Sequence, residues 1–370
     1  MKYLILEKCI EKVSYPRKIL RKDYLKDGRY PIISQEQDYI NGYWDNPKDV
    51  FYLERPVVVF GDHTQVLKYI DFNFVLGADG VKILQPIEDL NAKYLYYFLL
   101  CSNISSLGYA RHYRLIRGLN VPIHTLSEQQ RIVALLDQAL STIDTVKSNT
   151  ERNLENTREL FDNFLNSIFE SRGSLWVNAK LRHVIQQTET INPSLRPEDE
   201  FTYIDVSSVN NKLYCIETTS IVKGKNAPSR ARKLVKEGDI IFATVRPTLK
   251  RIAIIPSELD GQVCSTGYFV LRTLSGLINK YLFYYLRSNI FEMKMAELQK
   301  GASYPAVTDN ELKDQVISFP KSLIEQNQII AKLDLLEIKI KKLEENYQKI
   351  LAKSYELKQS ILHKAFSGEL

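Results

Sequence analysis

The chain has 370 residues, 44% of them hydrophobic and 25% charged, and a formal net charge of +6. These values are typical of a soluble globular protein with two domains, and so mild a positive charge only weakly indicates an anionic partner. No apolar run approaches the roughly 20 residues that span a bilayer, and the four scattered cysteines exclude a disulfide framework or a cysteine zinc site.

Residues 1–124 mix short β-rich runs with turn signals. The N-terminal run MKYLILEKCIEKV carries four charges inside its apolar stretch, so we do not expect a signal peptide, and a cytoplasmic location fits the free cysteines. Two runs predict strands and a third, aromatic run predicts a short helix: 56–60 (PVVVF), 80–84 (GVKIL) and 93–99 (KYLYYFL).

A long helix is predicted to start at residue 125. Thr125 and Glu128 have the spacing of a capping box, in which the hydroxyl accepts from a backbone N–H and the carboxylate bonds back to the cap residue. No proline or glycine follows until Gly173, a residue type that suits a helix C-terminus. We therefore expect a helix of about 40 residues, roughly 60 Å long.

Residues 174–321 repeat the same order of signals. Two runs predict strands and an aromatic run again predicts a short helix: 239–245 (DIIFATV), 267–272 (GYFVLR) and 280–286 (KYLFYYL). A second capping box follows at Ser322 and Glu325, and the next proline or glycine is Gly368. A second helix of about 40 residues is expected.

The two helix starts are copies of one sequence. LSEQQRIVALLD (126–137) and LIEQNQIIAKLD (323–334) share seven identities in twelve, and the offset of 197 continues without a gap to pair Phe169 with Phe366. An internal duplication is the economical explanation. From Ile329 to Ile361 the second copy has residues alternately four and three apart that are apolar except for Ser354, the a/d pattern of a coiled coil. We expect the helices to pack together; the alternative is that each packs only on its own domain.

Basic residues concentrate in two stretches. Between Lys223 and Arg251 there are nine Lys or Arg and two acids, and Arg111, His112 and Arg114 form a compact run with Tyr113. Arginine can bind phosphate, or the O6 and N7 atoms of guanine, so such stretches suit DNA. A solvated basic surface is the alternative for any single residue.

The motifs of catalysis are missing. There is no phosphate-binding loop, no G-x-G-x-x-G and no Asn-Pro-Pro-aromatic or Asp-Pro-Pro-aromatic run of an amino-methyltransferase. The five histidines lie far apart in the sequence, without metal-ligand spacing. We therefore expect a binding protein with no catalytic residue, no cofactor and no metal.

Several motifs together resemble the specificity (S) subunit of type I restriction–modification enzymes. They are the two L-x-E-Q-x-x-I helix openings, APSRARKLVKEGDIIFATVRPTLKR with CSTGYFVLR downstream, and GRYPIISQ with VVVFGDHT. The resemblance covers the whole chain. The first domain departs from the second: it is about 25 residues shorter and lacks a clear counterpart of SRARKLVKEGD.

The resemblance implies an α+β fold with an internal pseudo-twofold repeat. Two globular α/β target-recognition domains would be held apart by two long antiparallel conserved helices that form a coiled coil. The expected boundaries are 1–124 and 174–321 for the domains, with 125–173 and 322–370 for the helices.

The resemblance also implies function and partners. Each domain would read one half of a bipartite, asymmetric site in double-stranded DNA, as the non-catalytic part of a phage-defence system. Two methyltransferase (M) subunits would dock on the helices and methylate adenine, and restriction (R) subunits would add ATP-driven translocation and cleavage. The repeated segment is then needed twice because two M subunits bind. The alternatives are a stand-alone sequence-specific DNA-binding regulator, a coiled-coil scaffold that does not bind DNA, and, least favoured, an enzyme acting alone.

The candidate site residues follow from these stretches. The expected DNA-binding residues are His63, Lys68, Arg111, His112 and Arg114 in the first domain, and Arg230, Arg232, Arg246, Lys250, Arg251, Lys300 and Tyr304 in the second. The expected partner-binding residues are Glu128, Gln129, Glu325 and Gln326 at the helix openings.

Overall fold

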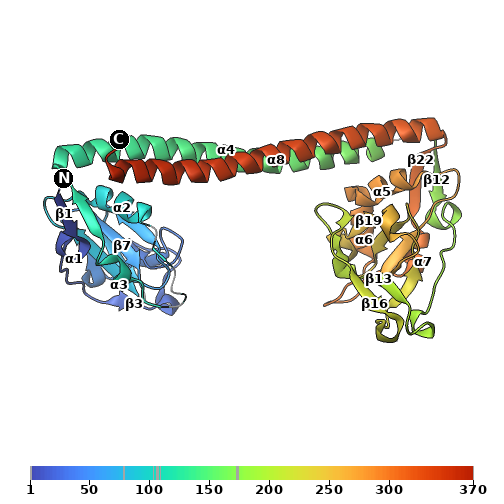
Figure 1. Ribbon diagram of the computed structural model, residues 1–370, viewed down its shortest axis with the longest axis horizontal. Helices are drawn as coiled ribbons and strands as arrows, with labels where there is room; N and C mark the ends of the chain where they lie inside the picture. Colours follow the sequence, from blue (N-terminus) through green and yellow to red (C-terminus); the bar gives the residue numbers. More distant parts are fainter. Residues whose placement is uncertain are drawn as a thin grey trace. The chain divides into compact units, whose positions relative to one another are not determined.

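The computed structural model describes residues 2–77, 80–102, 104–105, 108, 110–171 and 175–369. The chain divides into unit 1, which comprises Met1–Glu151 and Tyr347–Leu370, and unit 2, which comprises Arg152–Asn346. Each unit contains a β-rich domain and part of two 45-residue helices, α4 (Leu126–Glu170) and α8 (Leu323–Ser367), which pack together (Figure 1). The expected mixed fold class is confirmed. Within the described ranges, no helix has both the length and the apolarity needed to cross a membrane.

The domain of unit 1 has two small sheets and a separate strand pair. The antiparallel pair is β1 (Lys2–Ile5) with β11 (Asn120–Ile123). One sheet has the order β2 (Ile10–Glu11), β10 (Val81–Pro86), β7 (Val57–Gly61), β8 (Leu67–Ile70). The other has the order β3 (Lys18–Ile19), β9 (Phe74–Gly77), β4 (Tyr30–Ile33), β5 (Gly42–Trp44), with β6 (Val50–Phe51) also paired to β9. Its helices are α1 (Leu6–Cys9), α2 (Ala92–Cys101) and α3 (Tyr113–Ile116).

The domain of unit 2 is built in the same way. Its separate antiparallel pair is β12 (Trp176–Lys180) with β22 (Val316–Pro320). One sheet has the order β19 (Ile252–Ile254), β18 (Ile240–Ala243), β21 (Tyr268–Leu271), and the other has the order β16 (Ser220–Lys223), β13 (Glu200–Ile204), β20 (Val263–Ser265), β17 (Ala231–Leu234). A further pair is β14 (Val209–Asn210) with β15 (Cys215–Ile216). Its helices are α5 (Asn279–Arg287), α6 (Asn289–Leu298) and α7 (Asp309–Lys313).

The duplication extends into the domains, where the sequences have diverged. In unit 1, β7 pairs antiparallel with both β8 and β10, and in unit 2 β18 pairs antiparallel with both β19 and β21. The parallel pair β4–β9 likewise matches the parallel pair β13–β20. Equivalent strands therefore keep their partners although little of their sequence is shared.

The central strand of each unit is buried on both faces. Val58 and Phe60 of β7 lie in one core with α2, whereas Val57 and Val59 lie in a second core that includes β9. The alternation follows from the two-residue period of a strand, and burial on both faces explains the continuous apolar run. In β18 the same alternation assigns Ile240 and Phe242 to one core and Ile241 and Ala243 to another.

Both long helices begin as the capping motifs predict, with one difference. The Thr125 hydroxyl accepts from the Glu128 N–H at 3.3 Å, and the Ser322 hydroxyl accepts from the Glu325 N–H at 3.4 Å. The glutamate side chains bind other partners: Glu128 binds Arg131, and Glu325 accepts from the Trp176 indole N–H at 2.9 Å. Neither glutamate therefore completes the capping box. Glu128 binds a neighbour in its own helix, and Glu325 binds a residue of β12.

The helix ends also match the sequence in part. Gly368 follows α8 with a φ of 84°, the left-handed conformation expected at a helix C-terminus. Gly173, predicted to end the first helix, lies outside the described residues.

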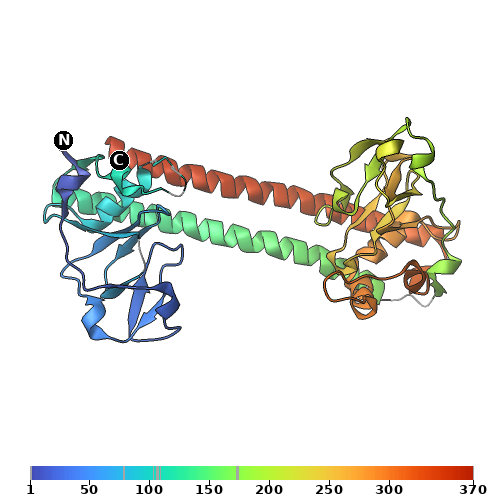
Figure 2. The same cartoon turned by 90° about the horizontal axis from the view of Figure 1, so that it is seen from below.

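The long helices pack on each other, as expected, and each also packs on the domains. In unit 1, Ile132 and Leu136 of α4 share a core with Leu362 of α8 and with α2. In unit 2, Phe161 and Leu165 of α4 share a core with Leu333 and Ile340 of α8 and with α5. Figures 1 and 2 show the two helices side by side. The middle of the predicted seam is less buried than expected, since Leu343, Ile350 and Leu357 are 40–50% exposed.

Phe169 and Phe366, paired by the repeat, have equivalent positions in the two units. Phe169, near the end of α4, packs edge-on against Tyr281 and Tyr285 of α5, with ring centroids 5.5 and 5.4 Å away. Phe366, near the end of α8, packs against Tyr94 and Phe98 of α2 at 5.1 and 5.6 Å. Each helix therefore starts on one domain and contributes an aromatic anchor to the core of the other.

The repeated glutamine is the anchor at each helix start. The Gln129 amide accepts from the Asn91 N–H at 2.8 Å and donates to the carbonyls of Asp89 and His124. The Gln326 amide accepts from the Ile278 N–H at 2.9 Å and donates to the carbonyls of Gly276 and Pro320. Both side chains are fully buried, so each amide makes three bonds in a site that excludes water.

The repeated aspartate is a second anchor, about two turns further along each helix. Lys93 and Tyr97 of α2 bind the carboxylate of Asp137, and the Lys93 ammonium lies 2.7 Å from it. Lys280 and Tyr284 of α5 bind Asp334 in the same way, at 2.7 and 2.6 Å. Burial raises the pKa of both tyrosines, so they remain neutral donors. The Gln and Asp identities of the repeat thus serve to fix a helix to its domain.

We expect Gln326→Ala to lower the free energy of unfolding by about 2–4 kcal/mol, because it leaves one buried N–H and two buried carbonyls without their partner. Urea-induced unfolding of the full chain measures this. The control is Gln328→Ala, two residues away on the exposed surface of the same helix. A loss for Gln326→Ala no larger than that of the control would contradict the anchoring role.

Candidate nucleic-acid interface

Four loops of unit 2 meet at one edge of its sheets. Backbone hydrogen bonds join them pairwise: Thr244 N–H to Gly267 O (2.9 Å), Thr266 N–H to Arg230 O (2.8 Å) and Arg246 N–H to Pro305 O (2.6 Å). The structure therefore brings together the segments of Arg230, Arg246 and Tyr304, which the sequence analysis selected separately.

The loop between β18 and β19 has a strained backbone. Arg246 and Lys250 both adopt left-handed φ values, 50° and 51°, on either side of the short 3₁₀ turn Pro247–Leu249. A non-glycine residue in this region costs on the order of 1 kcal/mol, and such strain concentrates at functional sites. The equivalent β7–β8 loop of unit 1 also has a left-handed residue, Gln65, with a φ of 59°.

Four of the candidate side chains in unit 2 are exposed. Arg230 and Arg246 project from their loops, and Tyr304 is 72% exposed. The Arg246 guanidinium lies 4.8 Å from the centre of the Tyr304 ring, in a cation–π contact. Lys300 is exposed too, but its ammonium binds Glu311 at 2.8 Å, which raises the pKa of Lys300.

Three other candidates in unit 2 bind within the domain. Lys250 binds Glu292 at 2.7 Å and Asn289 at 3.0 Å, and its side chain is 17% exposed. Arg251 donates to the Val206 carbonyl and Arg232 to the Ala231 carbonyl, both at 2.8 Å. The contacts of Lys250 and Arg251 tie the β18–β19 loop to other segments of the domain, whereas Arg232 bonds to the residue before it in β17.

The basic run from Lys223 to Arg251 is largely neutralised by acids from elsewhere in the chain. The ion pairs are Lys223 and Lys225 with Glu198, Lys233 with Asp309, Lys236 with Glu189 and Lys250 with Glu292. A count of charges along the sequence therefore overstates the positive charge of this region.

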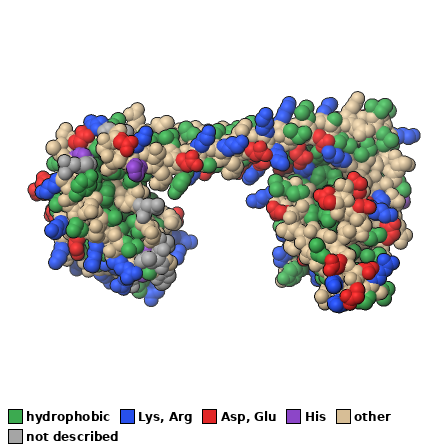
Figure 3. All heavy atoms as spheres, in the orientation of Figure 1, with side chains coloured by type: hydrophobic (Ala, Val, Ile, Leu, Met, Phe, Trp, Pro, Cys, Tyr) green, Lys and Arg blue, Asp and Glu red, His purple; other side chains and the backbone are tan. Residues whose placement is uncertain are grey.

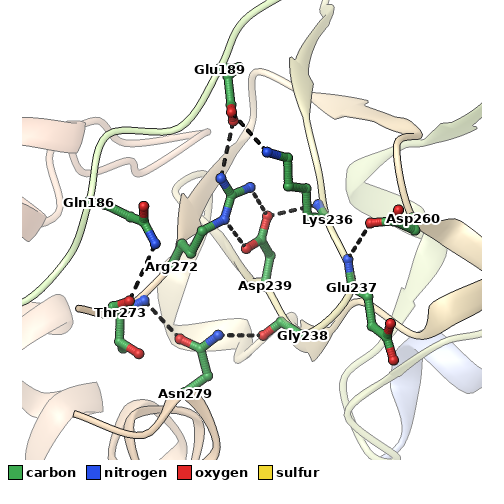
Figure 4. A network of polar contacts seen from close by, with 10 residues as sticks. All are labelled: Gln186, Glu189, Lys236, Glu237, Gly238, Asp239, Asp260, Arg272, Thr273 and Asn279. Carbon is green, nitrogen blue, oxygen red and sulfur yellow. Dashed lines mark hydrogen bonds and ion pairs between the residues drawn. The ribbon is translucent and has the colours of Figure 1, made fainter. Parts of the chain in front are cut away.

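Part of that run, residues 236–239, forms a structural network next to the start of β18 (Figure 4). Arg272 makes two parallel bonds of 2.7 Å to the buried carboxylate of Asp239, and a third of 3.1 Å to Glu189. Hydrogen bonds from Lys236 and Arg272 lower the pKa of Glu189 to about 2, and the bond to Asp239 raises the pKa of Arg272. Glu189 and Arg272 thus stay charged, and the strand that precedes the β18–β19 loop is fixed at its start.

In unit 1 a buried aspartate joins the equivalent loop to the basic–aromatic run. The Asp62 carboxylate accepts from the Tyr113 N–H, and the Asp62 carbonyl accepts from the His112 N–H, both at 2.7 Å. The His112 ring is 1% exposed, with Nδ1 3.0 Å from the same carbonyl. His112 therefore has an internal position, whereas Arg111 and Arg114 beside it are exposed.

Two further candidates in unit 1 are not fully exposed. His63 is half-buried in the β7–β8 loop, where its N–H donates to the Gln35 side chain at 3.2 Å. Lys68 is 3% exposed, and its ammonium donates to the Asp38 carbonyl and the Asn41 side chain. Removal from water lowers the pKa of Lys68 to about 8. Lys68 thus ties β8 to the 38–41 loop.

A second basic surface in unit 1 was missed by the sequence analysis. Figure 3 shows Lys and Arg side chains gathered at the end of unit 1 where Figure 1 places β3. Residues 17–29 contain six Lys or Arg and two acids, and Lys22, Lys26 and Arg29 are exposed. Arg17 and Arg21 form ion pairs with Asp49 and Glu36. The run PRKILRKD was the available signal.

The sequence matches the profile of one protein family. Residues 10–156 and 173–352 match the type I restriction modification DNA specificity domain, most of the chain. The chain belongs to this family. It is a DNA specificity subunit of a type I restriction–modification system and is itself non-catalytic.

Several specificity subunits are similar to this one. It is 22% identical to the EcoBI specificity subunit of Escherichia coli over 89% of this chain and 75% of that one. It is 28% identical to the HindI specificity subunit of Haemophilus influenzae, over 34% of this chain and 28% of that one. Among solved structures, the HsdS subunit of Thermoanaerobacter tengcongensis is 37% identical, with a TM-score of 0.44 and coverage of 46% and 44%. The S subunit of M. genitalium is 15% identical, with a TM-score of 0.42 and coverage of 99% and 96%.

The four residues of this specificity subunit expected to bind partners fall into two classes. Gln129 and Gln326 are fully buried and bind their own domain, so the structure gives them an internal role. Glu128 and Glu325 keep part of their side chains at the surface. The Arg131 guanidinium beside Glu128 lowers the pKa of that carboxyl, which therefore remains charged.

We expect Lys68 to make folding stability depend on pH above pH 8. Between about pH 8 and 10.5 the unfolded chain holds a proton on this lysine that the folded chain has released, so its contribution to stability rises with pH. The unfolding free energy of the wild type should therefore rise relative to Lys68→Met by at most about 1.4 kcal/mol per pH unit. Lys22→Met, at an exposed position, is the control, and its unfolding free energy should change with pH as that of the wild type does. A parallel curve for Lys68→Met would contradict the lowered pKa.

Proposed function

We propose that each domain of this specificity subunit reads one half of a bipartite, asymmetric site in double-stranded DNA. Residues 1–124 and 174–321 are the two target-recognition domains, and 125–173 and 322–370 form the spacer between them. The observation that carries this proposal is the pair of equivalent loops β7–β8 and β18–β19. Both have a residue with left-handed backbone, but His63 and Thr64 stand in one loop where Val245 and Arg246 stand in the other. Equivalent loops with different side chains suit two half-sites of different sequence.

The side chains that contact DNA are the exposed ones. They are Arg111 and Arg114 in the first domain, and Arg230, Arg246, Lys300 and Tyr304 in the second. The buried and internally bonded candidates His112, Lys68, Lys250, Arg251 and Arg232 instead position the loops. Lys22, Lys26 and Arg29 add contacts to phosphates beside the first half-site, because exposed cations bind the DNA backbone without reading sequence.

The long helices serve as the docking surface for two M subunits, and R subunits join the assembled complex. The half-exposed apolar residues Leu343, Ile350 and Leu357 support this, because apolar side chains at the middle of a helix pair favour a partner surface. Glu128 and Glu325 lie at equivalent helix starts and would face the two M subunits, although Glu128 is paired with Arg131 and Glu325 accepts from Trp176. The complex acts in the cytoplasm.

We expect adenine methylation at a split motif when this chain is produced with its M subunit, and no such motif with the M subunit alone. Long-read sequencing of DNA from the two cultures measures modified adenines across a genome and gives both half-sites at once. Absence of a new motif, despite a soluble complex, would contradict the proposal. Tight sequence-specific binding without any M subunit would then favour a stand-alone DNA-binding regulator.

We also expect the helices to set the gap between the half-sites. Insertion of four residues, about one turn, into both α4 and α8 lengthens each by about 6 Å, so the preferred gap should grow by one or two base pairs. The half-site sequences should stay the same, because the domains are unaltered. Motif mapping with the variant measures the gap. An unchanged gap would mean that the helices do not set the spacing.

A further inference from the structure

One arginine of unit 2 is held in a single orientation before any ligand binds. Its backbone N–H bonds to the Pro305 carbonyl at 2.6 Å, and its left-handed φ of 50° aims the side chain of Arg246 along the 303–305 loop. The guanidinium then donates through Nη2 to the Ser303 carbonyl at 3.1 Å and lies on the Tyr304 ring at 4.8 Å. Backbone, hydrogen bond and ring together fix its position.

This orientation matters for what the guanidinium can recognise. An arginine fork has five N–H donors in one plane, and a fork that is already fixed loses little further freedom when it binds. The Ser303 carbonyl takes one donor of the Arg246 guanidinium. Because the side chain is exposed, its other donors can reach a ligand. In the major groove, guanine presents two adjacent acceptors, O6 and N7, which match two parallel donors.

The neighbouring cations lack this arrangement. Lys300 is a point charge bound to Glu311, and Lys250 is bound to Glu292 and Asn289. In unit 1 the equivalent loop has Thr64 at the position of Arg246, next to the half-buried His63. Among these described loop residues, Arg246 of the second domain is the one that offers a fixed, planar set of donors.

We infer that Arg246 reads a guanine in the half-site of the domain 174–321, and that Tyr304 is the positioning residue for its guanidinium. The inference rests on the proposed function, since it requires the loop edge to face DNA. Arg246 supplies the two donors, and Tyr304 supplies the flat surface that keeps the fork in its plane. Lys300 and Arg230 beside it contact phosphate.

Methylation-motif mapping of the assembled complex tests this, with Arg246→Lys as the main variant. Lysine keeps the charge but loses the fork, so discrimination for guanine at one position of one half-site should fall about 5- to 150-fold. The other half-site should keep its sequence. Tyr304→Ala should weaken discrimination at the same position, and Tyr304→Phe should restore most of it, because the ring and not the hydroxyl supports the guanidinium.

The matched control is Arg196→Lys, an exposed arginine of the same domain whose side chain is 81% exposed and pairs with Asp199. It should leave the motif unchanged. The inference is overturned if Arg246→Lys lowers methylation at all sites equally with the motif intact, since a phosphate contact behaves in that way. It is also overturned if the wild-type half-site contains no guanine. A wild-type complex that yields no motif would instead overturn the proposed function itself.

Discussion

A buried glutamine amide at the first turn holds each long helix to its domain. Gln129 and Gln326 each satisfy one N–H and two carbonyls of the loops around them, in sites closed to water. An unpaired buried amide is costly, so the helix start and the loops can only form together. At the other end of each helix, Phe169 and Phe366 are held by the aromatic faces of α5 and α2. These contacts fix each long helix at both of its ends.

The loops at the edge of the sheets in unit 2 differ from the anchors in how their polar groups are paired. At the anchors, charges and amides are paired inside the protein, as where Lys280 and Tyr284 bind Asp334. At the edges, short strained turns present Arg246 and Tyr304 to solvent, and internal ion pairs such as Lys250–Glu292 hold the turn from behind. Strain at an exposed turn persists only where its surroundings over-determine it. A loop built in this way can change its side chains while the strands beneath it stay the same.

Much of the architecture could be predicted from local sequence signals. The capping residues, the repeat and the apolar strands gave the two helices, the central strands and the duplicated frame, because these signals depend on neighbours a few residues apart. The role of single charged residues could not be predicted in this way. Lys68 and His112 are buried, and the cations from Lys223 onward are matched by Glu189, Glu198 and Asp309, which lie elsewhere in the chain. Only tertiary contacts decide which cations are left at the surface. The basic run at 17–29, by contrast, was visible in the sequence as PRKILRKD and was missed.

The boundary between the two units falls inside helices, after Glu151 and after Asn346. The main core of unit 2, from Phe161 to Ile340, therefore belongs to one uninterrupted stretch of chain. A genetic exchange with both crossovers in the helical segments would transfer that core, its anchors and its loops as one block. Because the helical pattern on either side of each crossover is unchanged, such a transfer preserves the packing of the recipient. New combinations of the two domains can thus arise by recombination in a single step, without a series of point mutations that would each have to fold.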